Sequence, residues 1–230
     1  LVFMSNTQLN LIRKQLRQQL RQKRRQLTPY QQKNAAKKTA QRLVKLPCFK
    51  TAQRIAFYQA TDGELNPQAL IKLALKHHKK CYLPVLRRFP KYELAFVRIY
   101  AHSRLQKHRF GFKEPQGRPR LFIHQLDMVC MPLVGFDENC NRIGLGGGFY
   151  DRSLASHKNP QLIKLGFAHD CQLAMDVVPA FGETSAQLQG ANGSAERQPT
   201  MVRASSEGGS GRHCLLRWNG PSAVAVTGHA

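Results

Sequence analysis

The sequence predicts an α/β protein, a three-layer sandwich around a largely parallel sheet, built as a single domain with a basic N-terminal helix. Three observations favour this class. Short apolar runs typical of buried strands alternate with segments of helical periodicity, the N-terminal segment is both basic and amphipathic, and a glycine-rich loop follows an apolar run. We expect the α/β domain to span residues 4–180, followed by an atypical tail over residues 181–230.

The first predicted helix is the basic one. Leu9, Ile12, Leu16 and Leu20 recur at helical spacing, so one face can pack on a core. The stretch LIRKQLRQQLRQKRRQL holds seven Arg and Lys residues, and no acidic residue precedes Asp62. The basic face therefore lies either in solvent or against an anionic ligand.

The next elements follow from caps and apolar runs. Thr28-Pro29-Tyr30-Gln31 combines an N-cap threonine, a proline at the first helical position and a capping-box glutamine, and predicts a second helix that ends before Pro47. Asn66-Pro67 gives a similar signal for a third helix. We expect strands over 54–58, 80–86, 94–99, 127–136 and 162–169, with a further helix from about Phe149.

Composition limits the classes of protein and of partner. The chain has 230 residues, of which 42% are hydrophobic, and a net charge of +23 that raises nucleic acid, anionic membranes and phosphorylated ligands as partners. The lack of a long apolar run and of a signal-peptide pattern predicts a cytoplasmic protein with no membrane partner. The six cysteines contain no Cys-x-x-Cys pair and the nine histidines no His-Glu-x-x-His pattern, which indicates neither zinc nor disulfides.

The stretch RIGLGGGFYDR, Arg142 to Arg152, carries four glycines in five residues. Consecutive glycines can direct several backbone N–H groups at one anion, and a following helix start adds partial positive charge, so the loop is a candidate phosphate site. A tight turn is the alternative, since neither the Walker nor the dinucleotide spacing is present. Arg142 could add a formal charge. Asp151 could hold Mg²⁺ beside phosphates or only favour the helix dipole.

Other candidate residues lie outside the loop. Arg13 and Arg17 are one helical turn apart and could grip a polyphosphate, although other arginine pairs of that helix would serve equally. Glu64 follows a strand and could accept hydrogen bonds from an N–H-rich ring, or be solvated. The aromatic residues of FGFKEP, residues 110–115, could cover a flat ligand or belong to the core.

The motifs that carry a family resemblance are, in order along the chain, RKQLR, DGELNP, FGFKEP, MPLVGFDENCNRIGLGGGFYDR and LGFAHDCQ. With them the chain resembles the 5-formyltetrahydrofolate cyclo-ligase family, also called 5,10-methenyltetrahydrofolate synthetases. The resemblance runs from the basic helix to about Pro179. It implies an ATP- and Mg²⁺-dependent ligase that converts 5-formyltetrahydrofolate to 5,10-methenyltetrahydrofolate and releases ADP and phosphate. The partners would be a reduced folate and ATP, with no nucleic acid, for a protein expected to be a monomer.

The resemblance also implies site residues, although it identifies no catalytic acid or base. Glu64 would bind the folate, together with Gly146, Gly147, Gly148, Phe149 and Tyr150. Asp151 would contact the metal. The ATP-binding residues would be Arg13, Arg17, Arg142, Ile143, Gly144, Leu145, Gly146, Gly147, Gly148, Phe149, Tyr150 and Asp151.

The chain departs from the family pattern in two places. Phe149 stands where the family often has a second tyrosine. After Pro179 the family continues with an aspartate-containing segment and a final strand, whereas this chain reads AFGETSAQLQG and continues with a polar, Gly- and Ser-rich stretch that predicts disorder. We therefore expect weaker Mg²⁺ binding and an unpaired sheet edge. Two alternatives follow: a folate- and ATP-binding family member inactivated by this tail, or a basic nucleic-acid-binding protein.

Overall fold

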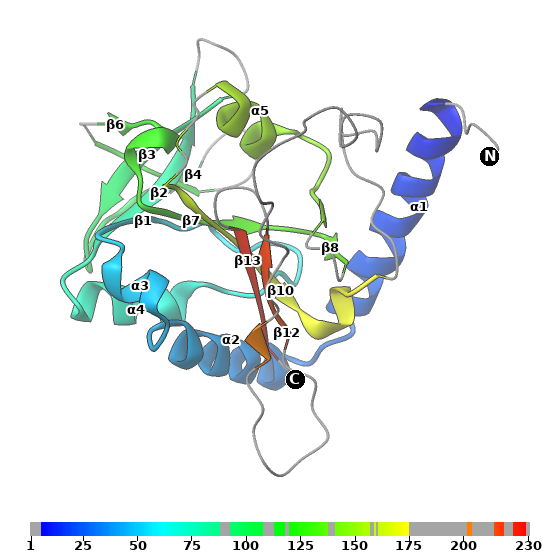
Figure 1. Cartoon of the computed structure of the whole chain (residues 1–230), viewed down its shortest axis with the longest axis horizontal. Coiled ribbons are helices and arrows are strands. Elements are labelled where there is room, and N and C mark those ends of the chain that lie inside the picture. Colours follow the sequence, from blue (N-terminus) through cyan, green and yellow to red (C-terminus); the bar gives the residue numbers. More distant parts are fainter. Residues whose placement is uncertain are drawn as a thin grey trace, which may run out of the picture.

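The computed structural model describes residues 6–87, 93–107, 113–117, 120–137, 141–156, 159 and 161–174, and the backbone of three strands beyond them. A nine-stranded sheet forms the middle of the molecule, in the order β11-β12-β13-β10-β7-β1-β2-β3-β6 (Figure 1). The five strands from β13 to β2 pair in parallel, and the strands outside them pair antiparallel. The bounds are β1 Arg54–Ala56, β2 Lys80–Leu86, β3 Leu94–Ile99, β6 Arg120–Leu121, β7 Met128–Pro132, β10 Ile163–His169, β11 Val202–Arg203, β12 Cys214–Trp218 and β13 Ala223–Gly228.

Helices cover both faces of this sheet. Helices α2 (Pro29–Leu43), α3 (Pro47–Thr51) and α4 (Gln68–Lys76) lie below it in Figure 1, and α5 (Phe149–Ser156) lies above. The side chains of β1 alternate accordingly: Ile55 packs in the core shared with α2 and α4, and Ala56 packs in the core on the α5 side. The predicted three-layer α/β class, with its largely parallel sheet, is confirmed.

The sequence predicts a cap at two helix starts: the Thr28 capping box is present, whereas Pro67, without a side-chain cap bond, takes the N-cap position of α4. Thr28 Oγ1 accepts from the Gln31 backbone N–H at 3.2 Å, and the Thr28 N–H donates to Gln31 Oε1 at 2.9 Å, so the capping box starts α2 as expected. Asn66 Oδ1 accepts from the Gln68 N–H at 2.9 Å at the start of α4. Pro47 follows the end of α2 but also starts α3, a short helix that the sequence analysis does not predict.

Helix α1 (Asn6–Arg25) packs by its apolar face on a short ribbon that leads to the glycine loop. The ribbon pairs β8 (Gly135–Phe136) with β9 (Arg142–Ile143), and Leu20 of α1 packs against Val134 and Ile143. A Cβ at Gly135 would lie 2.2 Å from a methyl carbon of Leu20, so glycine is required for this close approach. The single strand expected over 127–136 is therefore two, because the chain turns after β7 to meet α1.

The remaining elements lie around these layers. A second ribbon pairs β4 (Leu105–Lys107) with β5 (Lys113–Pro115), and two short 3₁₀ turns are η1 (Ile123–Gln125) and η2 (Asp170–Gln172). None of these elements is predicted from the sequence, since each is only three residues long.

The C-terminal strands contradict the expectation of an unpaired sheet edge. Strand β13 pairs in parallel with β10 from Lys164↔Ala223 to His169↔Gly228. Its Ala-Val-Ala-Val run suits the position between β10 and β12 because every residue in it is apolar and half are β-branched. The domain boundary at residue 180 stays a prediction, because residues 175–201, 204–213, 219–222 and 229–230 lie outside the described residues.

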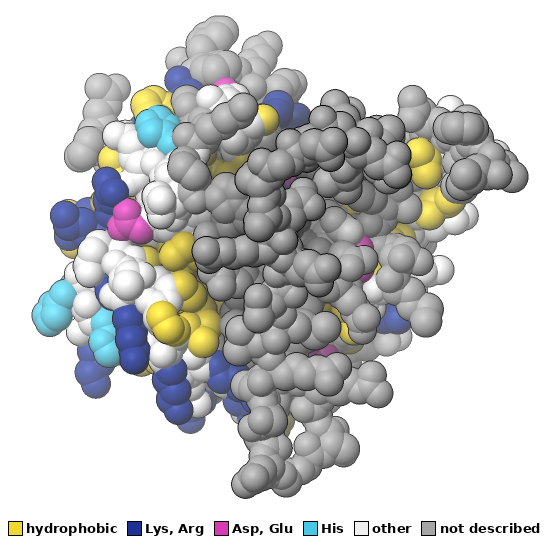
Figure 2. Space-filling model, in the orientation of Figure 1, with side chains coloured by type: hydrophobic (Ala, Val, Ile, Leu, Met, Phe, Trp, Pro, Cys, Tyr) yellow, Lys and Arg dark blue, Asp and Glu magenta, His cyan; other side chains and the backbone are white. Residues whose placement is uncertain are grey.

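Exposed lysines gather on the helical layer formed by α2, α3 and α4. No acidic residue occurs in these helices, and Figure 2 shows Lys and Arg side chains along the part of the surface where Figure 1 places them. No helix among the described residues has the length and apolar character needed to cross a membrane. Cys48, Cys81, Cys130 and Cys171 are free thiols in the described part of the chain.

Candidate active site

The glycine loop connects β9 to α5 in a conformation that requires glycine. Gly146 has φ +101° and Gly148 has φ +63°, values that residues with a Cβ rarely adopt. No heavy atom among the described residues lies within 4 Å of the position that a Cβ at Gly146 would take. The backbone can therefore be approached closely at Gly146, as an anion-binding loop requires.

Helix α1 reaches this loop through Arg17. Its Nε donates to the carbonyl oxygen of Gly144 at 2.9 Å. Burial, with the nearby positive charge of Arg13, lowers the pKa of Arg17. Two like charges held together beside a glycine loop are typical of a site where an anion would relieve their repulsion.

Arg142 and Asp151 join the two ends of the loop. Their side chains form an ion pair, and the Asp151 side chain is 57% exposed. Arg152 donates to the carbonyl oxygen of Gly147 and lies over the ring of Phe149, with its guanidinium carbon 5.6 Å from the ring centroid. The structure thus surrounds the loop with three arginines, of which the sequence analysis selects Arg17 and Arg142 but not Arg152.

Glu64 lies in the loop between β1 and α4 and is buried, with 5% of its surface exposed. Its Oε2 accepts from the Thr61 backbone N–H at 3.0 Å, whereas its Oε1 has no hydrogen-bond partner among the described residues. The nearest cation to Oε1 is Arg24 Nη2, at 3.8 Å. Burial raises the pKa of Glu64, while Thr61 and Arg24 oppose that rise. The alternative of a merely solvated glutamate is therefore wrong.

Tyr150 brings the glycine-loop side of the site to Glu64. Its hydroxyl oxygen is buried without a hydrogen-bond partner among the described residues. Burial raises the pKa of Tyr150, and the nearby Glu64 charge adds to that rise. The Tyr58 hydroxyl, which donates to the carbonyl oxygen of Leu65, has its pKa raised by burial and then by Glu64 in the same way. The Glu64 charge therefore acts on Tyr150 in the first turn of α5, as it does on Tyr58 after β1.

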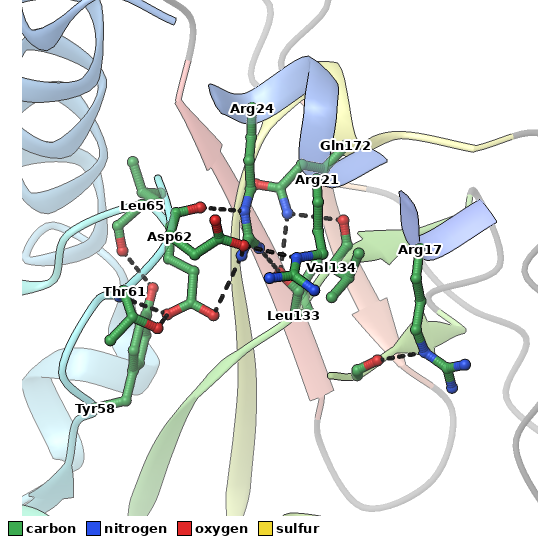
Figure 3. Close-up of polar contacts among 12 residues, drawn as sticks. Arg17, Arg21, Arg24, Tyr58, Thr61, Asp62, Leu65, Leu133, Val134 and Gln172 are labelled. Atoms are coloured by element: carbon green, nitrogen blue, oxygen red, sulfur yellow. Dashed lines mark hydrogen bonds and ion pairs between the residues drawn. The ribbon is translucent and has the colours of Figure 1, made fainter. Parts of the chain in front are cut away.

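An arginine cluster on α1 grips the loop that carries Glu64. Arg21 Nε lies 2.7 Å and Arg24 Nη2 3.0 Å from Asp62 Oδ2 (Figure 3). Arg25 binds Asp62 Oδ1. Burial raises the pKa of Asp62, but the three arginine hydrogen bonds outweigh it and lower the pKa to about 2. The sequence analysis misses these contacts. Asp62-Gly63 signals a turn, but nothing in the sequence shows which arginines reach it.

Arg24 is the central member of this cluster. It is fully buried, its Nε donates to the Asp62 carbonyl oxygen at 2.8 Å, and its Nη1 donates to the Leu133 carbonyl oxygen at 3.2 Å. Gln172 Nε2 donates to the same Leu133 oxygen and to Val134 O, both at 2.9 Å (Figure 3). One side chain of α1 thus joins the Glu64 loop to the end of β7.

His169 gives the site a pH-dependent contribution to stability. Burial lowers its pKa from 6.5 to about 4, so the folded protein binds its proton less readily than the unfolded chain between those values. Stability is therefore lost as the pH falls. We expect the free energy of unfolding, measured with urea, to be about 2 kcal/mol lower at pH 5 than at pH 7. The variant His169→Gln should lack this part of the pH dependence, and an unchanged pH profile in that variant would contradict the assignment.

A sequence profile described as the 5-formyltetrahydrofolate cyclo-ligase family matches residues 11–181. The chain belongs to this family. It is 38% identical over 162 residues to a Haemophilus influenzae protein named 5-formyltetrahydrofolate cyclo-ligase, a match that covers 70% of this chain and 87% of that protein. A protein of the same name from Escherichia coli K12 is 40% identical over 149 residues, covering 64% of this chain and 82% of the relative.

Solved structures agree with this cyclo-ligase assignment. The Aquifex aeolicus 5,10-methenyltetrahydrofolate synthetase, solved by NMR, has a TM-score of 0.64 and 27% identity, with 75% of this chain and 86% of that chain covered. A Mycoplasma pneumoniae 5,10-methenyltetrahydrofolate synthetase has a TM-score of 0.57, and the match covers 72% of this chain and 90% of the Mycoplasma chain. At 24% identity it supports the fold alone. The resemblance inferred from the motifs is confirmed, and so is the ligase class of the enzyme.

Within this cyclo-ligase chain, the structure brings together Arg17 with Gly144, Arg142 with Asp151, and Glu64 with Tyr150. The side chain of Ile143 packs under α1, so only its backbone is available to a ligand in the loop. Residues 108–112, which include the aromatic residues of FGFKEP, and residues 175–201, which include the start of the atypical tail, lie outside the described residues.

Proposed function

We propose that this chain catalyses the ATP- and Mg²⁺-dependent conversion of 5-formyltetrahydrofolate to 5,10-methenyltetrahydrofolate, with release of ADP and phosphate. One observation carries the proposal: in a chain of the cyclo-ligase family, Arg17 bonds to the glycine loop at Gly144, and the buried Glu64 after β1 has an Oε1 without a hydrogen-bond partner among the described residues. The homologues named above support the folate substrate. We also propose, from the sequence alone, a cytoplasmic monomer.

The glycine-loop side would hold ATP. Arg13 and Arg17 place two positive charges beside the loop, and its glycines allow the backbone N–H groups to approach phosphate oxygens. Arg142 adds a third cation at the start of the loop. Phosphate would relieve the repulsion between the arginines. The same arginines would therefore bind ATP and neutralise the negative charge of its phosphates.

Mg²⁺ would enter this site with ATP. Among the described residues no group of three or more His, Cys, Asp or Glu side chains surrounds a metal position. Mg²⁺ usually keeps several waters and uses one or two carboxylates plus substrate phosphates, so the exposed carboxylate of Asp151 beside the loop fits this type of site. Mg²⁺ would supply charge neutralisation at the phosphates.

The Glu64 side would hold the folate. Glu64 Oε1 and the Tyr150 hydroxyl are buried polar atoms without hydrogen-bond partners among the described residues, and such atoms are rare in native proteins unless a ligand pairs with them. A folate ring carries N–H donors and carbonyl acceptors that match a carboxylate and a phenol. We assign these two side chains to that ring.

The reaction needs positioning rather than a strong base. The formyl oxygen would attack the γ-phosphorus of ATP, and the bond between that phosphorus and ADP would break. The formyl oxygen would then carry the phosphoryl group, which makes it a good leaving group from the formyl carbon. N10 would then bond to this carbon, the carbon–oxygen bond would break as phosphate leaves, and N10 would lose its proton to solvent. The chain contributes by holding the two substrates adjacent and neutralising phosphate charge.

The test is the formation of the methenyl product, followed by its ultraviolet absorbance, with the purified chain, MgATP and 5-formyltetrahydrofolate. We expect ATP-dependent product formation, lowered about 100-fold or more by Asp151→Ala, because that change removes the proposed metal carboxylate. Asp127→Asn, which changes a carboxylate at the opposite end of the sheet, is the control. Product formation that Asp151→Ala leaves unchanged would contradict the metal assignment.

The two alternative functions predict different results in the same experiment. A family member inactivated by its tail would bind ATP and the folate without forming product. A nucleic-acid-binding protein would bind RNA or DNA with a steep dependence on salt. Against the latter, Arg21, Arg24 and Arg25 of the basic helix are occupied by Asp62, so the charge of α1 has partners within the chain.

A further inference from the structure

We propose that Asp62 is a positioning residue whose carboxylate holds the Arg24 guanidinium away from Glu64, so that Glu64 Oε1 stays available to the substrate. This inference rests on the proposed role of Glu64 in folate binding. Asp62 itself lies on the α1 side of the loop and would act only through Arg24.

The geometry shows one arginine nitrogen shared unequally between two carboxylates. Arg24 Nη2 lies 3.0 Å from Asp62 Oδ2, within hydrogen-bond distance, and 3.8 Å from Glu64 Oε1, beyond it. The other Arg24 nitrogens are fixed by the carbonyl oxygens of Asp62 and Leu133. Because the guanidinium is planar and two of its nitrogens are bonded to these carbonyl oxygens, Nη2 can approach Glu64 only through a small tilt of the whole group or a movement of the Glu64 side chain toward it (Figure 3).

The charge of Asp62 decides which partner Arg24 takes. A hydrogen bond to a carboxylate is about twice as strong as one to a neutral acceptor. With a neutral side chain at position 62, the nearest carboxylate to Arg24 Nη2 becomes Glu64. Closing that gap would give Glu64 Oε1 an internal partner in a buried site, and a folate would then compete with Arg24 for the same oxygen.

The backbone at position 62 permits a clean substitution. Asp62 has φ +53°, a region in which asparagine and aspartate are favoured over other side chains. Asp62→Asn therefore keeps both the backbone conformation and the side-chain shape while removing the charge. Helix α1 stays in place through Leu20 and through Arg17, which do not involve Asp62.

The experiment measures the affinity of the full chain for 5-formyltetrahydrofolate without ATP, and for ATP without folate, by calorimetric titration. We expect Asp62→Asn to weaken folate binding about tenfold and to change ATP binding less than about twofold. Arg21→Gln/Arg25→Gln is the control, because it removes the other two partners of Asp62 and leaves Arg24 in place. It should change folate affinity less than about twofold.

A double-mutant cycle separates positioning from general loosening of the fold. If Asp62 acts through Glu64, Asp62→Asn should have no further effect on folate affinity in the Glu64→Gln background. An equal loss in both backgrounds, a loss of ATP and folate affinity together, or a tenfold loss in the control variant would each overturn the inference. Failure of the unmodified chain to bind the folate would instead contradict the proposed function.

Discussion

Replacing Glu64 by glutamine should weaken 5-formyltetrahydrofolate binding about 10- to 100-fold, because a hydrogen bond to a charged, buried acceptor contributes about 1.5–3 kcal/mol. Stability should not fall with it. The carboxylate is buried, its Oε1 lacks a hydrogen-bond partner among the described residues, and Arg24 keeps its closer bond to Asp62. A buried charge removed at such a position leaves the folded state equally or more stable. Calorimetric titration and thermal unfolding measure the two effects.

The matched control for Glu64→Gln is Asp127→Asn, another change of carboxylate to amide. Asp127 lies just before β7, at the opposite end of the sheet, where it accepts from the backbone N–H groups of Gln53 and Arg54 at 2.9 and 2.7 Å. This variant should lose stability, because the Arg54 ion pair and two charge-assisted bonds weaken, and should bind folate normally. Folate binding that survives Glu64→Gln would contradict the role of Glu64.

Arg24→Met should be the most destabilising substitution in the site, with a loss of about 3–5 kcal/mol in the free energy of unfolding. Methionine fills a similar volume, but it removes the donor of the Asp62 carbonyl oxygen, one of the two donors of the Leu133 carbonyl oxygen, and the buried cation beside Asp62 and Glu64. Arg24 itself is fully buried, so water replaces its lost hydrogen bonds poorly. Urea unfolding at neutral pH measures the effect.

Arg25→Met is the control for this effect, since Arg25 also binds Asp62 but its side chain is 56% exposed. Exposed ion pairs contribute about 0–1 kcal/mol, so the control should lose no more than that. Equal losses in the two variants would show that Arg24 acts as an ordinary surface arginine, in contradiction to its burial.

Local signals were enough to predict most of the fold. The Thr28 capping box and the apolar runs of β2, β3 and β10 are short-range patterns, and each formed the expected element. The turn after Pro132 was not predictable, because the apolar run continues through it. Its cause is the packing of Leu20 on Val134 and Ile143, a contact between distant segments. Strand β13 was missed because the polar composition around it favours disorder.

The residues of the candidate site also fall into a group that local sequence patterns predict and a group that depends on contacts between distant segments. Glycines, Asp151 and Glu64 could be selected because turn chemistry and the family motifs mark them individually. The partners of Asp62 could not, since α1 offers several arginines at equivalent spacing and only the register of α1 on the β8–β9 ribbon decides among them. The burial of Glu64 was also hidden, because it depends on Arg24 and Tyr150 arriving from distant parts of the chain.

The central claim is that ATP and a reduced folate react in one site, and it is tested most directly by the ratio of the two products. The purified chain with MgATP and 5-formyltetrahydrofolate should form one ADP for each 5,10-methenyltetrahydrofolate, and no ADP when the folate is omitted. ADP formation that continues at the same rate without folate, or methenyl product formed without ADP, would contradict the account.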